Sequence, residues 1–403
     1  MSVWKKVKIK DIAILDNGIN FNKSAYASGI KIIGVSDFKD RFSPDFSTLQ
    51  EVKEEIVRSG DYLQPGDILF VRSNGNRDLV GRCMLIDKNI LSTFSGFCIR
   101  LRINDKNTYN PYFFTYHFKA PLFRKSIAGS AIGANIQNLS QNRLGNYELN
   151  IPEYFIQCRI AEILFRYDSL IENYQKQIKL LEEAALRLYK EWFVDLRFPG
   201  YEKTKIVDGL PEGWSFIRIK DRYKTVLGGT PSRFINSYWG GDISWINSGE
   251  INKLRIIKPS EKITQDGYKN SSTKLMPIHT TILAITGATL GQVSYTEIET
   301  CANQSVVGII DEENTTNEFL YLNIYNNIHS MINKATGGAQ QHINKDIVSD
   351  YFIMLPDESI LIEFRKRINP IFNTIRDYFF IIEDIIEARD RLLPKLMNGE
   401  IEV

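Results

Sequence analysis

The sequence predicts an α+β protein. Two mixed α/β domains alternate with two long, antiparallel coiled-coil helices in a pseudo-two-fold internal repeat. Two observations support this fold class. First, the segment that begins at Pro152 returns at Pro356, 204 residues later in a chain of 403. A repeat this long is a duplicated domain-and-helix unit, whereas solenoid repeats are about 20–50 residues long. Second, a heptad pattern of apolar residues follows each of these prolines.

The residues before each proline have the composition of a small mixed domain. Short runs rich in β-branched and aromatic residues alternate with Gly, Asn, Ser and Asp turns, which is typical of strands. In the first domain we expect strands at 67–72, 83–86 and 97–103 and a helix at 109–127. In the second we expect strands at 281–286, 293–295 and 306–310 and a helix at 317–334. A turn-rich linker opens the second domain, so we divide the chain into 1–151, 152–197, 198–355 and 356–403.

The segments after the two prolines predict helices that pair with each other. Apolar residues recur at alternating steps of three and four over four heptads, which specifies a partner helix. The seam includes Ile171, Ile178, Leu181 and Leu188 in the first helix, and Ile375, Ile382, Ile385 and Leu392 in the second. Arg389 interrupts the second seam, and Pro370 is expected to kink that helix or delay its start. An antiparallel pair would place the two domains at opposite ends of a rod. The alternative is two independent amphipathic helices, each on its own domain.

Composition restricts the function without deciding it. The net charge is +2, but residues 1–151 hold 21 Lys and Arg against 14 Asp and Glu. A basic domain attracts phosphates, although this excess is also ordinary for a soluble domain. The four cysteines are scattered and indicate neither a disulfide framework nor a zinc site. Without an apolar run of about 20 residues or a signal segment, we expect a cytoplasmic protein with no membrane association.

Motifs for catalysis are mostly missing from the sequence. It has no GxxxxGK[ST] or strand-linked GxGxxG loop, and its four histidines form no HExxH motif. We therefore expect no catalytic residue, no metal site and no cofactor in this chain. One alternative is an Mg²⁺-dependent DNA endonuclease that uses Asp45, Glu51 and Lys53, the residue types of a nuclease metal site. The spacing barely permits a hairpin, so a solvated charged loop is the competing interpretation.

The chain resembles a known family, the specificity (S) subunits of type I restriction–modification enzymes. In the second half the resemblance rests on motifs that occur in the family's order: Gly209-Leu-Pro-Glu-Gly-Trp214, Gly228-Gly-Thr-Pro-Ser232, Tyr238-Trp-Gly-Gly-Asp-Ile-Ser-Trp245, Thr286-Gly-Ala-Thr-Leu-Gly291 and Gly337-Gly-Ala-Gln-Gln-His-Ile-Asn344. In the first half, Gly66-Asp-Ile-Leu-Phe-Val-Arg-Ser-Asn-Gly75 with Val80-Gly81 is similar to the corresponding element. The first half departs from the family by lacking a Gly-Thr-Pro-Ser stretch.

The resemblance implies two target-recognition domains, each reading half of a split site on double-stranded DNA. It also implies that the long helices act as a spacer and dock two modification subunits. Those partners bind S-adenosylmethionine and methylate adenine N6, and two restriction subunits that use ATP and Mg²⁺ can join them. This chain would itself be non-catalytic. A third hypothesis is a coiled-coil scaffold without a nucleic-acid role.

Residues that read DNA should present Arg to guanine and Asn or Gln to adenine. The polar loops of both domains supply such residues, although each loop could equally be an exposed turn or a cap. The DNA-binding candidates are Arg72, Ser73, Asn74, Arg77, Asn135, Gln137 and Asn138 in the first domain, and Ser232, Arg233, Tyr238, Lys253, Arg255, Gln340, Gln341, His342 and Lys345 in the second. Lys253 and Arg255 are expected to contact phosphates, which positions a domain without specifying sequence.

Overall fold

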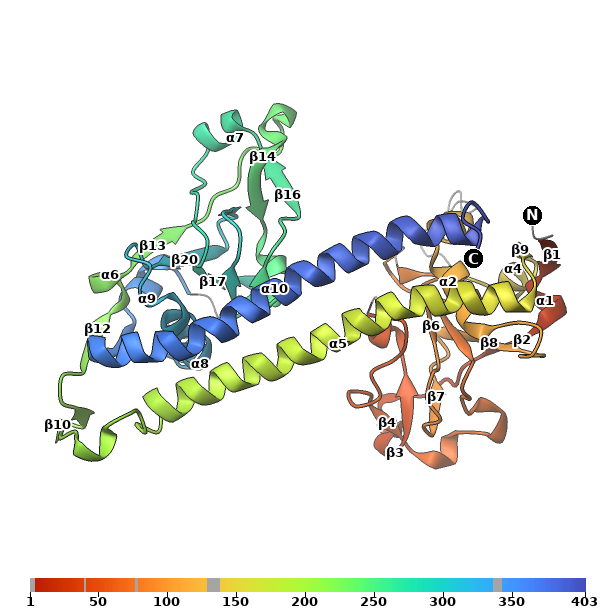
Figure 1. The fold of residues 1–403 in the computed structure, drawn as a ribbon, viewed down its shortest axis with the longest axis horizontal. Coiled ribbons are helices and arrows are strands. Elements are labelled where there is room, and N and C mark those ends of the chain that lie inside the picture. Colours follow the sequence, from red (N-terminus) through yellow and green to blue (C-terminus); the bar gives the residue numbers. More distant parts are fainter. Residues whose placement is uncertain (1–3, 40, 77–78, 129–137, 336–342) are drawn as a thin grey trace. The chain divides into compact units, whose positions relative to one another are not determined.

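The computed structural model describes residues 4–39, 41–76, 79–128, 138–335 and 343–403. It contains two compact units, one of residues 1–172 with 384–403 and one of residues 173–383. Each unit combines a mixed α/β domain with parts of two long helices (Figure 1). In the described parts of the chain, no helix is both long enough and apolar enough to cross a membrane.

The first unit is built on a four-stranded antiparallel sheet. Its strand order is β2 (Ala13–Asn17), β8 (Cys98–Ile103), β5 (Ile68–Val71) and β6 (Cys83–Leu85). A three-stranded sheet has the order β4 (Glu51–Val52), β3 (Tyr26–Ile33) and β7 (Ser92–Phe94), with β3 and β7 parallel. The ends of the domain are joined by the antiparallel pair β1 (Lys5–Lys8) and β9 (Glu148–Ile151).

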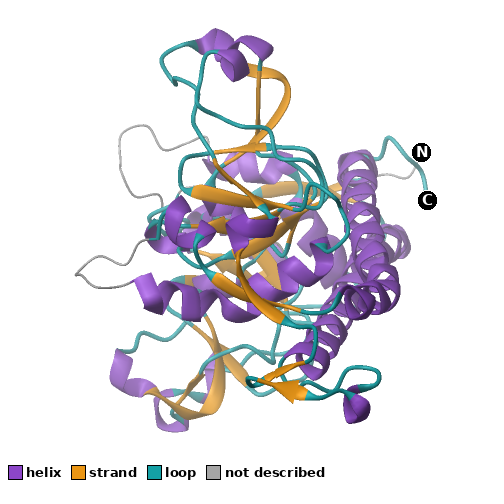
Figure 2. Ribbon diagram, turned by 90° about the vertical axis from the view of Figure 1, so that its left-hand side faces the viewer, coloured by secondary structure: helices purple, strands orange, loops and turns teal. Residues whose placement is uncertain are grey.

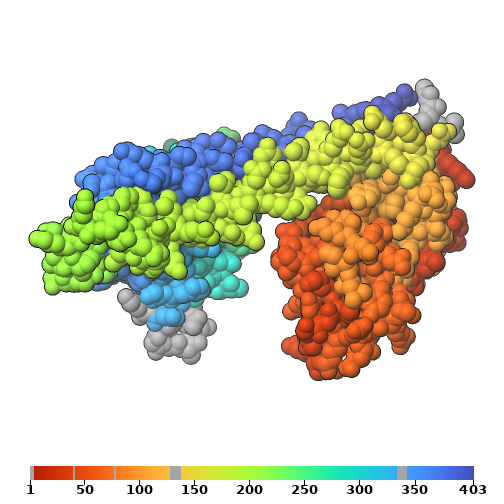
Figure 3. All heavy atoms as spheres, turned by 60° about the horizontal axis from the view of Figure 1, so that its bottom comes forward, coloured from red at the N-terminus to blue at the C-terminus, as the bar shows by residue number. Residues whose placement is uncertain are grey.

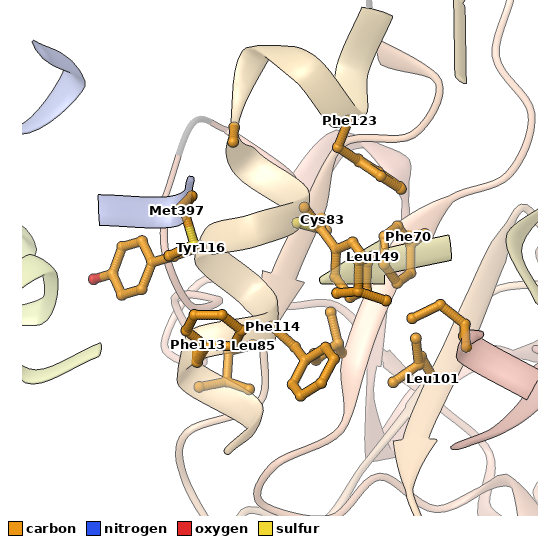
Figure 4. Packing of buried hydrophobic residues seen from close by; sticks show 14 of the residues in the cluster. Phe70, Cys83, Leu85, Leu101, Phe113, Phe114, Tyr116, Phe123, Leu149 and Met397 are labelled. Atoms are coloured by element: carbon orange, nitrogen blue, oxygen red, sulfur yellow. The ribbon is translucent and has the colours of Figure 1, made fainter. Parts of the chain in front are cut away.

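Helices cover one face of this sheet and form the core with it. The helices are α1 (Ile9–Ile12), α2 (Pro111–Lys119), α3 (Pro121–Ala128) and α4 (Gln141–Gly145). The Asn110 side chain caps α2 by accepting from the amides of Tyr112 and Phe113. In the core, aromatic side chains of α2 pack on apolar residues of β5, β6 and β8, and Met397 of the second long helix lies beside Tyr116 (Figure 4).

The second unit repeats the arrangement of the first, with a main sheet of five strands in place of four. The strand order is β13 (Lys224–Leu227), β20 (Val306–Ile310), β17 (Thr281–Ala284), β18 (Val293–Thr296) and β15 (Arg255–Ile256). The smaller sheet has the order β16 (Glu261–Ile263), β14 (Trp239–Ile246) and β19 (Cys301–Ala302), and β12 (Ser215–Arg218) pairs with β21 (Phe352–Leu355). A hairpin of β10 (Ile206–Val207) and β11 (Leu210–Pro211) precedes them, and the helices are α6 (Ile219–Arg222), α7 (Gln265–Lys269), α8 (Asn317–Ala335) and α9 (Lys345–Ser349).

Close backbone contacts show that the two domains are copies of one fold. A Cβ on Gly18 would lie 2.2 Å from the carbonyl oxygen of Phe94, and one on Gly228 would lie 2.1 Å from that of Asn303. Both glycines are therefore needed where the chain passes close to the end of β7 or of its counterpart β19. The pairing of β3 with β4 and that of β14 with β16 also shift register at matching positions.

The two long helices are α5 (Tyr154–Phe193) and α10 (Glu358–Met397), each of 40 residues. In the first unit the beginning of α5 packs with the end of α10, and in the second the end of α5 packs with the beginning of α10, so they run antiparallel in both (Figure 1). Figure 2 shows the two long helices lying side by side. The predicted pairing is confirmed. Of the predicted seam residues, Ile171, Ile178, Ile375 and Ile382 are buried, and Leu181, Leu188, Ile385 and Leu392 are half-buried.

One predicted detail of the helices was wrong. The helix expected at 109–127 is two helices, α2 and α3, because Pro121 disfavours helical backbone at the preceding Ala120. Pro370 does not delay the start of the second long helix, since α10 begins at Glu358 and continues through the proline, and the alternative of a kink there stays a prediction. The predicted strands and the helix that begins at Asn317 are confirmed. The four-segment division of the chain stays a prediction.

Candidate nucleic-acid interface

Three segments of the first unit meet at one edge of its main sheet. The amide of Arg72, directly after β5, donates to the carbonyl of Phe97 at 2.8 Å, and the amide of Leu139 donates to the carbonyl of Arg72 at 2.9 Å. Ser73 and Asn138 form an isolated antiparallel bridge. The candidate residues after β5 are thus brought together with Asn138, about 65 residues along the chain. We call the described residues 72–76, 95–97 and 138–139 the first edge.

The first edge presents groups suited to reading bases. The half-buried Arg72 guanidinium donates to the carbonyl of Gly96 at 3.4 Å, a long contact that leaves a group with five N–H donors able to reorient toward a ligand. The Asn74 carbonyl oxygen accepts from the Asn76 amide at 2.7 Å and shapes the turn. Phe97, with 61% of its surface exposed, stands beside Arg72. Sequence reasoning missed Phe97, because an aromatic residue at the start of a strand is usually part of the core.

The second unit has an edge built from the corresponding segments. The amide of Ile285 donates to the carbonyl of Ser305 at 2.9 Å, and the amide of Ile343 donates to the carbonyl of Ile285 at 3.1 Å. The turn that follows β17 contains a short helix, η9 (Gly287–Thr289). Close by, the Thr230 hydroxyl donates to the Gln304 side-chain oxygen at 2.5 Å. We call residues 285–289, 303–305 and 343–344 the second edge; the polar groups of Gln304 and of the neighbouring Thr230 were not predicted.

The candidates between Ser232 and Tyr238 form a well-supported loop. The Arg233 guanidinium lies 3.5 Å from the ring centroid of Trp239 and pairs with Glu261 at 2.6 Å. The Trp239 indole donates to the carbonyl of Ser232 at 3.1 Å. Ser232 and Arg233 are exposed and Tyr238 is half-buried. Since the Arg233 charge already has a carboxylate partner, a DNA phosphate would have to compete with Glu261.

Lys253 lies in a groove of about 920 Å³ in the second unit. Side chains of α5, of α8 and of the turn after the second edge also line it, and the basic ones among them are Arg187, Lys190, Arg197 and His329. Glu191 and Asp195 bring negative charge to the same groove, and Asp195 pairs with Arg197 at 3.2 Å. The position of Lys253 is therefore consistent with a phosphate contact, which stays a prediction.

The predicted phosphate contact at Arg255 is wrong. Only 1% of its side chain is exposed, and the guanidinium lies 3.3 Å from a carboxylate oxygen of Glu182 and 3.4 Å from one of Glu297. The rings of Tyr295, Tyr321 and Phe372 surround it at 4.6–5.3 Å. A guanidinium enclosed in this way cannot reach a phosphate, and these partners lie at least 40 residues away along the chain.

Six further candidates, Arg77, Asn135, Gln137, Gln340, Gln341 and His342, lie outside the described residues. Lys345 is described and is half-buried at the first position of α9. The preceding Asn344 caps α9 by accepting from the Ile347 amide at 2.9 Å. Two roles were predicted as alternatives for the polar residues of this loop, DNA contact and helix capping. Asn344 has the capping role.

The residues of the endonuclease alternative have local structural roles. The Asp45 carboxylate accepts from the Ser47 hydroxyl at 2.6 Å and pairs with Arg41, and these contacts lower its pKa, the Ser47 bond most. Glu51 accepts from the Gly29 amide at 3.1 Å and pairs with Lys31, whereas Lys53 pairs with Glu55. Within the described ranges, no group of three or more His, Cys, Asp or Glu could hold a metal ion. Nothing in this geometry supports the endonuclease.

Comparisons with known proteins agree with this fold. A family model described as the type I restriction modification DNA specificity domain matches residues 1–183 and again 211–386. The type I restriction enzyme HindI specificity subunit of Haemophilus influenzae is 25% identical over the full length of both chains. The putative MjaX specificity subunit of Methanocaldococcus jannaschii is 23% identical over 99% of this chain and 94% of its own.

The fold is also that of a solved structure. The S subunit of a type I restriction–modification system from M. genitalium superposes with a TM-score of 0.60 at 15% identity, covering 98% of this chain and 96% of that one. The family model matches most of the chain in two copies, one for each half of the internal repeat. The chain therefore belongs to the family of type I restriction–modification DNA specificity proteins.

Proposed function

We propose that this protein is the DNA-specificity subunit of a type I restriction–modification complex and reads a split sequence, one half-site with each unit. The observation that carries the proposal is the equivalence of the two edges. Each is held by the same pair of backbone hydrogen bonds, made by Arg72 and by Ile285, yet the first edge has Arg72, Ser73 and Asn74 where the second has Ile285, Thr286 and Gly287. One scaffold with two different sets of polar groups suits two different half-sites.

The chain would act with partner subunits and would perform no chemistry itself. By family resemblance, two modification subunits dock on it, bind S-adenosylmethionine and methylate adenine N6. Two restriction subunits would bring ATP and Mg²⁺. The separation of roles fits the candidate site, where the described polar groups suit hydrogen bonding to bases and none forms a nucleophile–base pair.

The long helices would set the distance between the half-sites. Because α5 and α10 pair through a heptad seam, adding or removing seven residues in both changes the length by about 10 Å, at 1.5 Å per residue, and preserves the seam. We expect the accepted gap between half-sites to change while the half-sites stay the same. An unchanged gap would refute the spacing role.

Single-molecule methylome sequencing of the host with and without this gene tests the proposed function directly. We expect N6-methyladenine to disappear at one split motif, two short halves around a fixed gap. If methylation persists at every motif in a host that carries active modification subunits, the proposal fails. Co-purification of the chain with a methyltransferase subunit then tests the partner assignment separately.

A further inference from the structure

In the first unit, a half-buried ion pair occupies the position where the heptad seam is interrupted. Arg389 of α10 lies 2.5 Å from a carboxylate oxygen of Asp168 on α5, and the Tyr116 hydroxyl of α2 donates to the other oxygen at 2.6 Å. The Asp168 side chain is 12% exposed and Tyr116 is 1% exposed. This Arg389 cluster ties both long helices to the helix that covers the sheet, and Figure 3 shows α5 lying directly against that part of the unit.

In the second unit, the misassigned Arg255 has the same kind of environment. The guanidinium, at the edge of the main sheet, contacts Glu182 of α5, Tyr321 of α8 and Phe372 of α10. Glu297, directly after β18, supplies the second carboxylate. The Arg255 cluster therefore also joins a sheet to both long helices through one charged group.

Stability alone does not account for these clusters. Removing two charges from water costs about as much as their attraction returns, so a buried ion pair adds little net stability compared with apolar residues of similar size. In addition, Nε of Arg255 and Oε1 of Glu182 are buried and have no hydrogen-bond partner. Each lies near an oppositely charged side chain, but the geometry is not that of a hydrogen bond. Apolar side chains at Arg255, Glu182 and Glu297 together would avoid these costs.

A buried pair does specify register. The apolar seam repeats every seven residues, so two helices that slide by one heptad again bring apolar residues together. Asp168 and Arg389 face each other in one register only, and any other leaves Asp168 without its ion-pair partner and Arg389 with only Asp390, its neighbour on α10. One buried polar residue is known to fix the register of coiled coils in this way.

We propose that the Arg389 and Arg255 clusters are positioning devices. Each fixes the register and rotation of its reading domain on the long helices, and thereby restricts the gap that the protein accepts between half-sites. This inference rests on the proposed function. It concerns how each domain is held on its own stretch of helix and is separate from which bases the edges read.

The test measures gap discrimination by the full chain in complex with its modification subunits. Duplexes carry both half-sites with gaps of the native length and one base pair shorter or longer, and binding to each is compared. In D168N and in E182Q we expect unchanged half-sites but a loss of about 2- to 30-fold in preference for the native gap, the usual range of such coupling. The exposed neighbours supply controls: E183Q on α5 and R391Q on α10 should keep the wild-type preference.

A double variant separates positioning from stability. D168N leaves Arg389 with Asp390, its exposed neighbour on α10, as its only charge partner, whereas D168N/R389M removes the half-buried positive charge and should regain most of the lost thermal stability. We expect its gap preference to remain weakened. If gap preference returns together with stability, or never changes in any cluster variant, the positioning role is refuted. If the wild-type complex binds no split sequence at any gap, the proposed function itself fails.

Discussion

Glu297 provides a test of the Arg255 cluster that does not depend on DNA. Its side chain is 2% exposed and lies 3.4 Å from Arg255 and 3.9 Å from His279. Burial raises the pKa of Glu297 from 4.5 to about 7, although the charge of Arg255 opposes this rise. The folded protein therefore holds this proton more tightly than the unfolded chain does.

The sign of the effect on stability follows from that difference. Below pH 4.5 both states are protonated and the contribution to stability is fully present. As pH rises toward 7 the unfolded chain releases the proton first, so stability falls, and above 7 the loss is complete. The difference between 4.5 and about 7 corresponds to about 3 kcal/mol in the free energy of unfolding.

Replacing Glu297 with Gln removes the titrating group and leaves Glu182 to balance Arg255. We expect urea unfolding to show that wild type loses about 2.5 kcal/mol relative to E297Q between pH 5 and pH 8, since part of the total is already lost at pH 5. Comparing the two proteins cancels the titration of all groups that they share. Glu299, two residues on and exposed, supplies the control E299Q, which should follow wild type. Parallel pH profiles for wild type and E297Q would refute the assigned burial of this carboxylate.

Three further predictions concern the edges and their scaffold. R72A should weaken binding by about 1–3 kcal/mol and relax base preference in one half-site only, measured by competition with substituted duplexes; an equal loss on every sequence would exclude base reading. K253Q should weaken binding uniformly and reduce the slope of log K against log[salt] by about 0.9, measured by salt titration, whereas an unchanged slope would exclude a phosphate contact. G228A should destabilise the protein by about 1–3 kcal/mol or more in urea unfolding, because its Cβ would lie 2.1 Å from the Asn303 carbonyl oxygen; wild-type stability would contradict that contact.

Much of the fold could be predicted because it depends on local pattern. The prolines at 152 and 356 precede helices that begin at Tyr154 and Glu358, and the apolar period of the following residues identifies their buried faces. The buried strands were likewise marked by short β-branched runs between turns. In contrast, the break between α2 and α3 was missed because the apolar pattern continues through Ala120.

Charged residues were harder to place, since their partners lie far away in sequence. Arg255 sits in a segment with Lys253 and looks like part of a basic surface, but Glu182 and Glu297 surround it in the folded chain. Arg389 seemed only to weaken the helix seam, although Asp168 on the other helix explains its presence. The residues next to either arginine in the sequence give no sign of these distant carboxylate partners. The pairing of Arg72 with residues near 97 and 139 depends on tertiary structure in the same way.

The two edges suggest why the halves of this chain differ so much in sequence while keeping one fold. The hydrogen bonds that hold each edge join backbone atoms, so they place few demands on side chains at 73–74 or 286–287. The fold constrains other positions more strongly. Gly18 and Gly228 cannot carry a Cβ without contacting a carbonyl oxygen, and the residues that pack against the sheets must be apolar. If the edges read DNA as proposed, substitutions there would change which bases are read at little cost in stability. One unit could then acquire a new half-site specificity while the other unit keeps its own.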